Sequence, residues 1–277
     1  MTTWICATCG VEHTDTSSPP EVCDICADER QYLPPGGQVW TTHEELSAAH
    51  GTDVVDLEPG LHGIVVDPGF AIGQRTLLVR TSGGNLLWEP SGVVTERLVE
   101  DVRDLGGVAA VAASHPHLVG AAATWAERFD APFWFNEDDR RWLRSTDTHV
   151  RWWTGHAEVL PGITLVQAGG HFPGSAVAHW ADGADGRGEL LSGDTLMVGQ
   201  DRASVSFMRS YPNLVPLSER LVRRIVTALD PWEYDRIRSG FGVVVESDAR
   251  AVVTRSADRY IGWITDTIRD PSERGEG

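Results

Sequence analysis

Two histidines one residue apart are the part of the sequence best suited to chemistry. His115 and His117 flank Pro116, directly after the apolar run 108–114. Pro116 fixes its own φ and disfavours the helical region for the residue before it, and in an extended chain residues i and i+2 point the same way. We therefore expect an extended tripeptide whose two imidazoles face one point. The site would lie at the end of a buried strand, where α/β folds place their sites.

Two later strand ends supply further candidate metal ligands. His171 follows the strand expected at 162–168, behind two glycines, and Asp194 lies at the end of the strand expected at 189–195. Three imidazoles and one carboxylate form a good zinc shell. The sequence thus predicts that these two residues join the histidine pair in one metal site. Asp194 is then either the fourth ligand or the catalytic group that orients a water and accepts its proton.

The four cysteines of the chain all lie near its N-terminus, in two Cys-x2-Cys pairs. They are Cys6, Cys9, Cys23 and Cys26. Two such pairs at this separation predict a four-thiolate structural zinc site, a zinc ribbon. Iron in a rubredoxin-like site would use the same ligands, and the same cysteines could instead form two disulfides or a redox pair. Disulfides are disfavoured without a secretion signal. A ribbon this short has almost no core, so the metal would supply much of its folding energy.

A Pro- and Gly-rich break at residues 33–38 predicts a domain boundary, with the ribbon at 1–35 and a larger domain at 36–277. Thr42 and Glu45 form a capping box for a helix over 43–50. Strands are expected at 52–58, 62–67, 76–81, 85–89, 108–114, 131–135, 162–168, 175–181 and 189–195, and further helices at 95–106, 120–130, 136–143, 216–229 and 248–268. This order predicts sheets covered by helices, an α/β layered domain.

The motifs "SHPHLVG", "GGHFPGS" and "LLSGDT" together resemble those of the metallo-β-lactamase-fold hydrolases. They occur in that family's order and at its usual separations, and residues 71–89 look like its first sheet. The resemblance covers about residues 52–265 and implies a four-layer αββα sandwich with a metal site at one edge of the two sheets. It implies that His115 and His117 are the paired histidines of the first metal site and His171 its third histidine. Asp194 corresponds to the aspartate that reaches or bridges the metals.

The chain departs from the family pattern directly after the histidine pair. The family continues with an aspartate and a histidine, whereas this chain has Val119 and Gly120, which cannot coordinate a metal. The family's last histidine also has no counterpart, because the equivalent stretch 236–246 contains none. A second metal would have only Asp194 to hold it. We therefore expect a single-metal site.

The predicted function is hydrolysis of a small ester, thioester, lactone or amide. Zinc held by three imidazoles with an open position lowers the pKa of a bound water from 15.7 to about 7, which makes a nucleophile. Arg209 and Tyr211 are candidates for contacting the substrate. One alternative is a mononuclear non-haem iron oxidoreductase, because histidines and a carboxylate with open positions also suit iron. Another is a non-catalytic binding protein that retains the metal site.

Charge and hydrophobicity argue against two classes of partner, nucleic acids and membranes, and leave a small-molecule substrate as the expected partner. The formal net charge of −17 over 277 residues lacks the basic excess that phosphate-backbone binding needs, so no nucleic-acid partner is expected. No run of about 18 apolar residues is present, so no membrane span is expected. The first residues show no secretory signal, and we expect a cytoplasmic protein. Nothing in the sequence indicates an oligomeric state.

Overall fold

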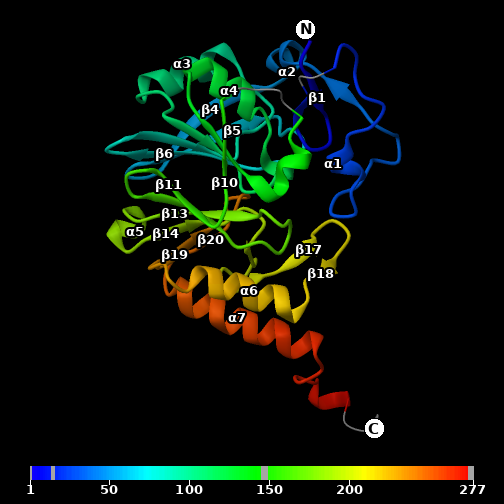
Figure 1. The fold of residues 1–277 in the computed structure, drawn as a ribbon, viewed down its shortest axis with the longest axis vertical. Coiled ribbons are helices and arrows are strands. Elements are labelled where there is room, and N and C mark those ends of the chain that lie inside the picture. Colours follow the sequence, from blue (N-terminus) through cyan, green and yellow to red (C-terminus); the bar gives the residue numbers. More distant parts are fainter. Residues whose placement is uncertain (1, 14–15, 145–148, 274–277) are drawn as a thin grey trace.

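Two large β-sheets face each other in the larger domain, and helices cover the outer face of each (Figure 1). The computed structural model describes residues 2–13, 16–144 and 149–273. The predicted αββα sandwich is confirmed by this arrangement. Of the helices in the described residues, none combines the length and the hydrophobicity needed to span a bilayer.

The first sheet has seven strands in the order β10-β9-β8-β7-β6-β5-β4. Its strands are β4 (Gly51–Glu58), β5 (Leu61–Asp67), β6 (Thr76–Thr81), β7 (Gly84–Trp88), β8 (Ala110–Ala112), β9 (Phe133–Asn136) and β10 (Val150–Trp153). The strands from β4 to β7 are antiparallel, and those from β7 to β10 are parallel. Helices α3 (Glu96–Asp104) and α4 (Ala122–Phe129) make the crossovers. Thr95 caps α3, as predicted, by accepting a hydrogen bond from the Leu98 amide.

The second sheet has six strands in the order β11-β12-β13-β14-β19-β20. They are β11 (His156–Leu160), β12 (Ile163–Gln167), β13 (Ala176–Trp180), β14 (Glu189–Leu191), β19 (Arg236–Arg238) and β20 (Val244–Val245). Helices α6 (Glu219–Leu229) and α7 (Ala249–Ile264) pack side by side on its outer face (Figure 1). Short elements complete this half of the chain: α5 (Gly183–Gly186) joins β13 to β14, and β15 (Met197–Val198), β16 (Val205–Ser206), β17 (Met208–Ser210) and β18 (Val215–Pro216) follow β14.

Both faces of the first sheet are buried, and the successive apolar side chains of its strands pack on opposite faces. On β6, Leu77 and Val79 pack in the cluster between the two sheets, while Leu78 packs with the helices on the other side. Successive side chains of a strand point to opposite faces, so an unbroken apolar run such as this fits a sheet covered on both sides. The polar residues of the site are therefore left to the strand ends.

The ribbon forms a three-stranded sheet of its own, in the order β2-β1-β3. It contains β1 (Trp4–Cys6), β2 (Glu12–His13), β3 (Trp40–Thr41) and the short α1 (Asp24–Ala27), and is followed by α2 (His43–Ala49) with the predicted capping box. The strand β3 lies beyond residue 35, where the boundary is predicted. The carboxylate of Glu12 accepts hydrogen bonds from the Ala123 and Thr124 amides at 2.6 and 3.1 Å, which ties the ribbon to the start of α4.

One predicted helix takes a tighter form. Residues Glu137–Trp142 form a 3₁₀ helix, not an α-helix, although Asn136 caps it as predicted by accepting from the Asp138 amide at 3.0 Å. The segment is short, and bonds such as Leu143 N–H to the Arg140 carbonyl at 3.2 Å close its last turn, which is the usual setting for 3₁₀ geometry.

Candidate metal sites and the adjoining cavity

Side chains from several strand ends converge at one edge of the two sheets. His115 follows β8, His117 lies in a 3₁₀ turn (Pro116–Leu118), His171 lies between β12 and β13, and Asp194 follows β14. One ligand atom from each lies within 4.8 Å of the others, and all four residues are buried. The structure therefore brings together the four residues that the sequence singled out.

The separations between these ligand atoms suit one small cation. His117 Nδ1 lies 3.3 Å from His171 Nε2, and Asp194 Oδ2 lies 3.5 Å from His115 Nε2 and 3.8 Å from His171 Nε2. Tetrahedral ligands at 2.0–2.2 Å from zinc stand about 3.3–3.6 Å apart. His115 Nε2 and Asp194 Oδ1 are buried and have no hydrogen-bond partner among the described residues, which is expected of groups that face a metal.

The turn after His115 differs from the prediction. His115 itself is extended, with φ −168° and ψ 174°, but Pro116–Leu118 form a 3₁₀ turn that the Leu118 amide closes on the His115 carbonyl at 3.1 Å. The predicted fully extended tripeptide is therefore wrong, because the fixed φ of proline also suits the first position of a helical turn. The two rings still meet, with centroids 5.1 Å apart, and His117 presents Nδ1 where His115 presents Nε2.

Neighbouring groups fix the tautomers of two of the histidines. Ser114 Oγ lies 2.8 Å from His115 Nδ1 and donates to Glu89 Oε1 at 2.5 Å, so it accepts the Nδ1 proton. His171 Nδ1 lies 3.2 Å from the Met208 carbonyl, to which it donates. In both rings the lone pair is left on Nε2, which faces the cluster. A glutamate at the end of β7 therefore takes part in the site through Ser114.

The ionisation states of the site favour metal binding. Burial lowers the pKa of His171 to about 3 and holds the pKa of His117 well below its ordinary value, so both rings are neutral at pH 7. Burial acts to raise the pKa of Asp194, but the adjacent imidazoles of His115 and His171 lower it on balance. Neutral imidazoles and an ionised carboxylate are the ligating forms of these residues.

Packing and backbone conformation explain why Val119 and Gly120 follow the histidine pair. Val119 is 4% exposed and packs in the core beside α4. Gly120 has φ +49°, and a Cβ at this position would lie 1.8 Å from the Pro90 carbonyl oxygen. The backbone thus leaves no room for a histidine at 120. We infer that installing the family's Asp-His pair here would disrupt the turn and would not create a second metal site.

A cavity of about 420 Å³ adjoins the metal cluster. His117, His171 and Asp194 form part of its wall, and Phe241, from the stretch that lacks the family's last histidine, forms another part. Three ribbon residues, Arg30, Gln31 and Tyr32, also line it. Sequence reasoning missed these three, since no motif marks them. It also missed Glu89, although a glutamate at the end of an apolar strand was a signal that could have found it.

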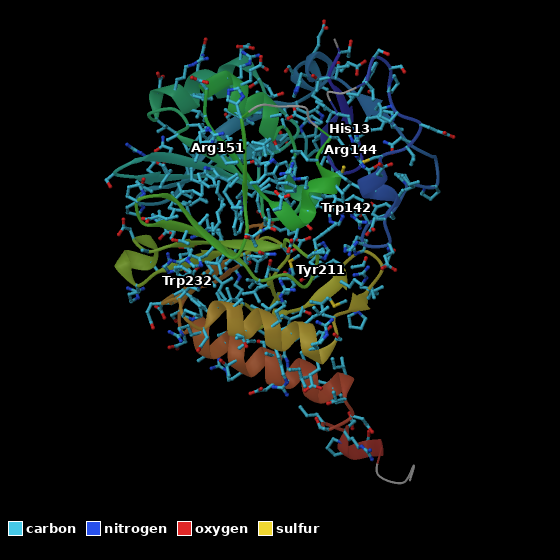
Figure 2. The ribbon with its side chains drawn as sticks, viewed as in Figure 1. His13, Trp142, Arg144, Arg151, Tyr211 and Trp232 are labelled. Atoms are coloured by element: carbon cyan, nitrogen blue, oxygen red, sulfur yellow. The ribbon has the colours of Figure 1, made fainter. Side chains whose placement is uncertain are left out.

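The two residues predicted to contact substrate differ in position. Tyr211 lines the cavity on the side of the molecule where the ribbon lies (Figure 2), and its hydroxyl donates to the Asp194 carbonyl at 3.1 Å. Burial holds the pKa of Tyr211 well above 10, so the hydroxyl keeps its proton. Arg209 is not among the residues lining the cavity and instead pairs with Glu29 of the ribbon, with Nε at 2.7 Å from Oε1. Substrate contact by either residue stays a prediction.

The cysteine cluster forms the second candidate metal site. Cys6 and Cys26 have their sulfurs 3.7 Å apart, and those of Cys9 and Cys23 are 3.9 Å apart. Four thiolates at 2.3 Å from a zinc stand about 3.8 Å apart, whereas a disulfide would need about 2 Å. All four sulfurs belong to buried, free cysteines. The donor set and its spacing are consistent with a zinc ribbon.

Comparison with known proteins gives the family and the fold. The chain is 42% identical over 264 residues to the YmaE protein of Bacillus subtilis (strain 168), and the match covers 94% of this chain and 96% of the relative. The chain belongs to the YmaE family. No family model matches the sequence.

Solved structures with the same fold are more distant in sequence. VMB-1 matches with a TM-score of 0.58 at 12% identity over 77% of this chain and 98% of that one. The DIM-1 metallo-β-lactamase matches with a TM-score of 0.56 at 14% identity over 76% of this chain and 96% of that one. TTHA1623, in a di-iron-bound form, matches with a TM-score of 0.50 at 22% identity over 74% and 98%. This member of the YmaE family thus has the metallo-β-lactamase fold.

Proposed function

We propose that the protein is a metal-dependent hydrolase that cleaves a small ester, thioester, lactone or amide at a mononuclear zinc site. One observation carries the proposal: three imidazoles and one carboxylate, all buried, converge within 4.8 Å beside a cavity of about 420 Å³. A cavity of this size suits a small molecule. The fold of the chain is also one that known metallo-β-lactamases share.

In this proposal the histidines bind the metal ion and Asp194 takes part in proton transfer. His115, His117 and His171 would hold the ion, and a zinc ion in such a shell lowers the pKa of bound water to about 7. Asp194 Oδ1 is buried without a partner among the described residues, so it can accept a hydrogen bond or a proton at that atom. Tyr211 holds the Asp194 main chain through its hydroxyl.

The number of ions follows from the donors present. In the part of the chain that the structure describes, the cysteine cluster is the one other group of three or more His, Cys, Asp or Glu residues spaced to hold an ion. Two metal ions at the cavity would need ligands beyond the four already used. The proposal is therefore one zinc at this site and one in the ribbon.

Iron is the competing metal, since TTHA1623 with the same fold binds two irons. Elemental analysis of protein purified without added metal decides between them. Two zinc ions per chain are expected, falling to one in His117→Ala, together with loss of turnover on a panel of esters, thioesters, lactones and amides. Iron at the histidine site would favour the oxidoreductase alternative. Full zinc occupancy with no turnover on any panel member would favour a binding protein and overturn the hydrolase proposal.

A further inference from the structure

The ribbon loop after the second cysteine pair is built into the wall of the cavity. Figure 1 shows this segment beside the β17–β18 hairpin. Ser210 Oγ donates to the Arg30 carbonyl at 3.0 Å, and Asn213 Nδ2 donates to the Gln31 carbonyl at 3.0 Å. These bonds fix the main chain of the loop at the point where its side chains reach the cavity. The ribbon is therefore part of the site and more than a separate metal-binding appendage.

Arg30 is held as a rigid cation between the loop and the metal ligands. It is 6% exposed, its Nε donates to the His171 carbonyl at 2.6 Å, and its Nη1 donates to Asp28 Oδ1 at 2.6 Å. The guanidinium carbon lies 4.3 Å from the centroid of the Phe172 ring. Phe172 in turn contacts all three metal-site histidines, with ring centroids 4.9 to 5.6 Å away. The plane of the guanidinium is thus set relative to the imidazoles.

The Nη2 group of the Arg30 guanidinium is free to bind a ligand. Arg30 Nη2 has no hydrogen-bond partner among the described residues, and Arg30 is the one arginine or lysine among the described residues lining the cavity. The side-chain oxygen Oε1 of Gln31 is also buried and has no hydrogen-bond partner among the described residues. A guanidinium in fixed orientation matches the planar geometry of a carboxylate. Asp28 offsets part of the charge but occupies only Nη1.

We propose that the ribbon loop 28–32 is the substrate-recognition wall of the site and that Arg30 binds a carboxylate of the substrate. The inference rests on the proposed function and narrows it to carboxylate-bearing acyl substrates. The bond to be cleaved would face the histidine cluster while the carboxylate engages Arg30 Nη2. Arg30, His117, His171 and Asp194 all line the same cavity of about 420 Å³, so one small molecule can reach both the guanidinium and the metal site.

Binding of two matched probes tests the proposal without requiring turnover. Acetohydroxamate and the monohydroxamate of succinate carry the same metal-binding group, and the second adds a carboxylate on a short spacer. Isothermal titration of the zinc-loaded full-length protein should give about tenfold tighter binding of the succinate probe, the range of a charge-assisted hydrogen bond. Arg30→Gln should bring the ratio of the two affinities close to one, while Arg30→Lys should keep part of the preference.

Glu29→Gln is the matched control, because it removes the ion pair between the same loop and Arg209 but leaves Arg30 in place. It should retain the full preference. Equal weakening of both probes by Arg30→Gln, or loss of the preference in Glu29→Gln, would show that the loop acts only on the structure of the site and would overturn the proposal. The absence of any preference in the wild type would do the same. A preference with no turnover on the substrate panel would instead overturn the hydrolase function and leave carboxylate recognition in place.

Discussion

Replacement of Gly120 by alanine tests whether the backbone leaves room for a side chain at this position after the histidine pair. A left-handed φ such as the +49° of Gly120 costs an alanine about 1–2 kcal/mol. The new Cβ would also lie 1.8 Å from the Pro90 carbonyl oxygen and 2.8 Å from its carbon, so the main chain must move. Overpacking of this kind costs about 1–3 kcal/mol, which brings the expected loss to about 2–5 kcal/mol.

Gly155 provides a control with the same backbone strain and no clash. Its φ is +67°, and no atom lies within 4 Å of the point that an alanine Cβ would occupy. Gly155→Ala should therefore lose only about 1–2 kcal/mol. Urea unfolding followed by tryptophan fluorescence, at saturating zinc, measures both variants. Equal free energies of unfolding for Gly120→Ala and Gly155→Ala would refute the argument that the Pro90 carbonyl excludes a side chain here.

Three further predictions concern the ribbon, its anchor and a buried acid. Cys23→Ala should lower the metal content from two ions to one per chain and lower the urea midpoint, because the metal supplies folding energy; unchanged content by elemental analysis would contradict the ribbon assignment. Glu12→Ala should cost about 2 kcal/mol, since it leaves buried amides at the start of α4 without an acceptor, whereas exposed Glu21→Ala should cost little; equal costs would contradict the anchor. Burial raises the pKa of Asp139 to about 6 from its ordinary 3.8, so the folded protein keeps a proton that the unfolded chain has released. The free energy of unfolding should therefore fall by about 2 kcal/mol between pH 4 and pH 6 relative to Asp139→Asn, and a parallel pH dependence of the two proteins would exclude this.

Local patterns were sufficient to predict the elements that local forces determine. The cap at Thr95, the capping box of Thr42 with Glu45, and the two-sided apolar strands all depend on residues a few positions apart. The same holds for the candidate ligands, because each follows an apolar strand and the ends of neighbouring strands meet at one edge. Strands β10 and β11 were missed, since exposed polar residues such as Arg151 and Glu158 interrupt their apolar pattern.

Features that depend on distant segments could not be predicted in this way. The sequence shows a glycine at 120, but only the fold shows that the Pro90 carbonyl occupies the space beside it. The position of Arg30 is a stronger case, because its partner His171 lies 141 residues away. No periodicity or spacing connects two such segments, and the ribbon was therefore predicted as a unit separate from the cavity.

The bonds that join the ribbon loop to the cavity also constrain the order of events during synthesis. The ribbon is translated first, yet Arg30 meets Ser210 across 180 residues of chain. At about 5–20 residues per second, the ribosome needs about 10 to 40 s to produce that stretch. Until His171 and Ser210 have been made, Arg30, which is buried in the finished protein, lacks the partners that hold its side chain and its carbonyl. The cavity is completed only after most of the second sheet has been made, so a nascent chain can fold its cysteine site well before it acquires a closed pocket.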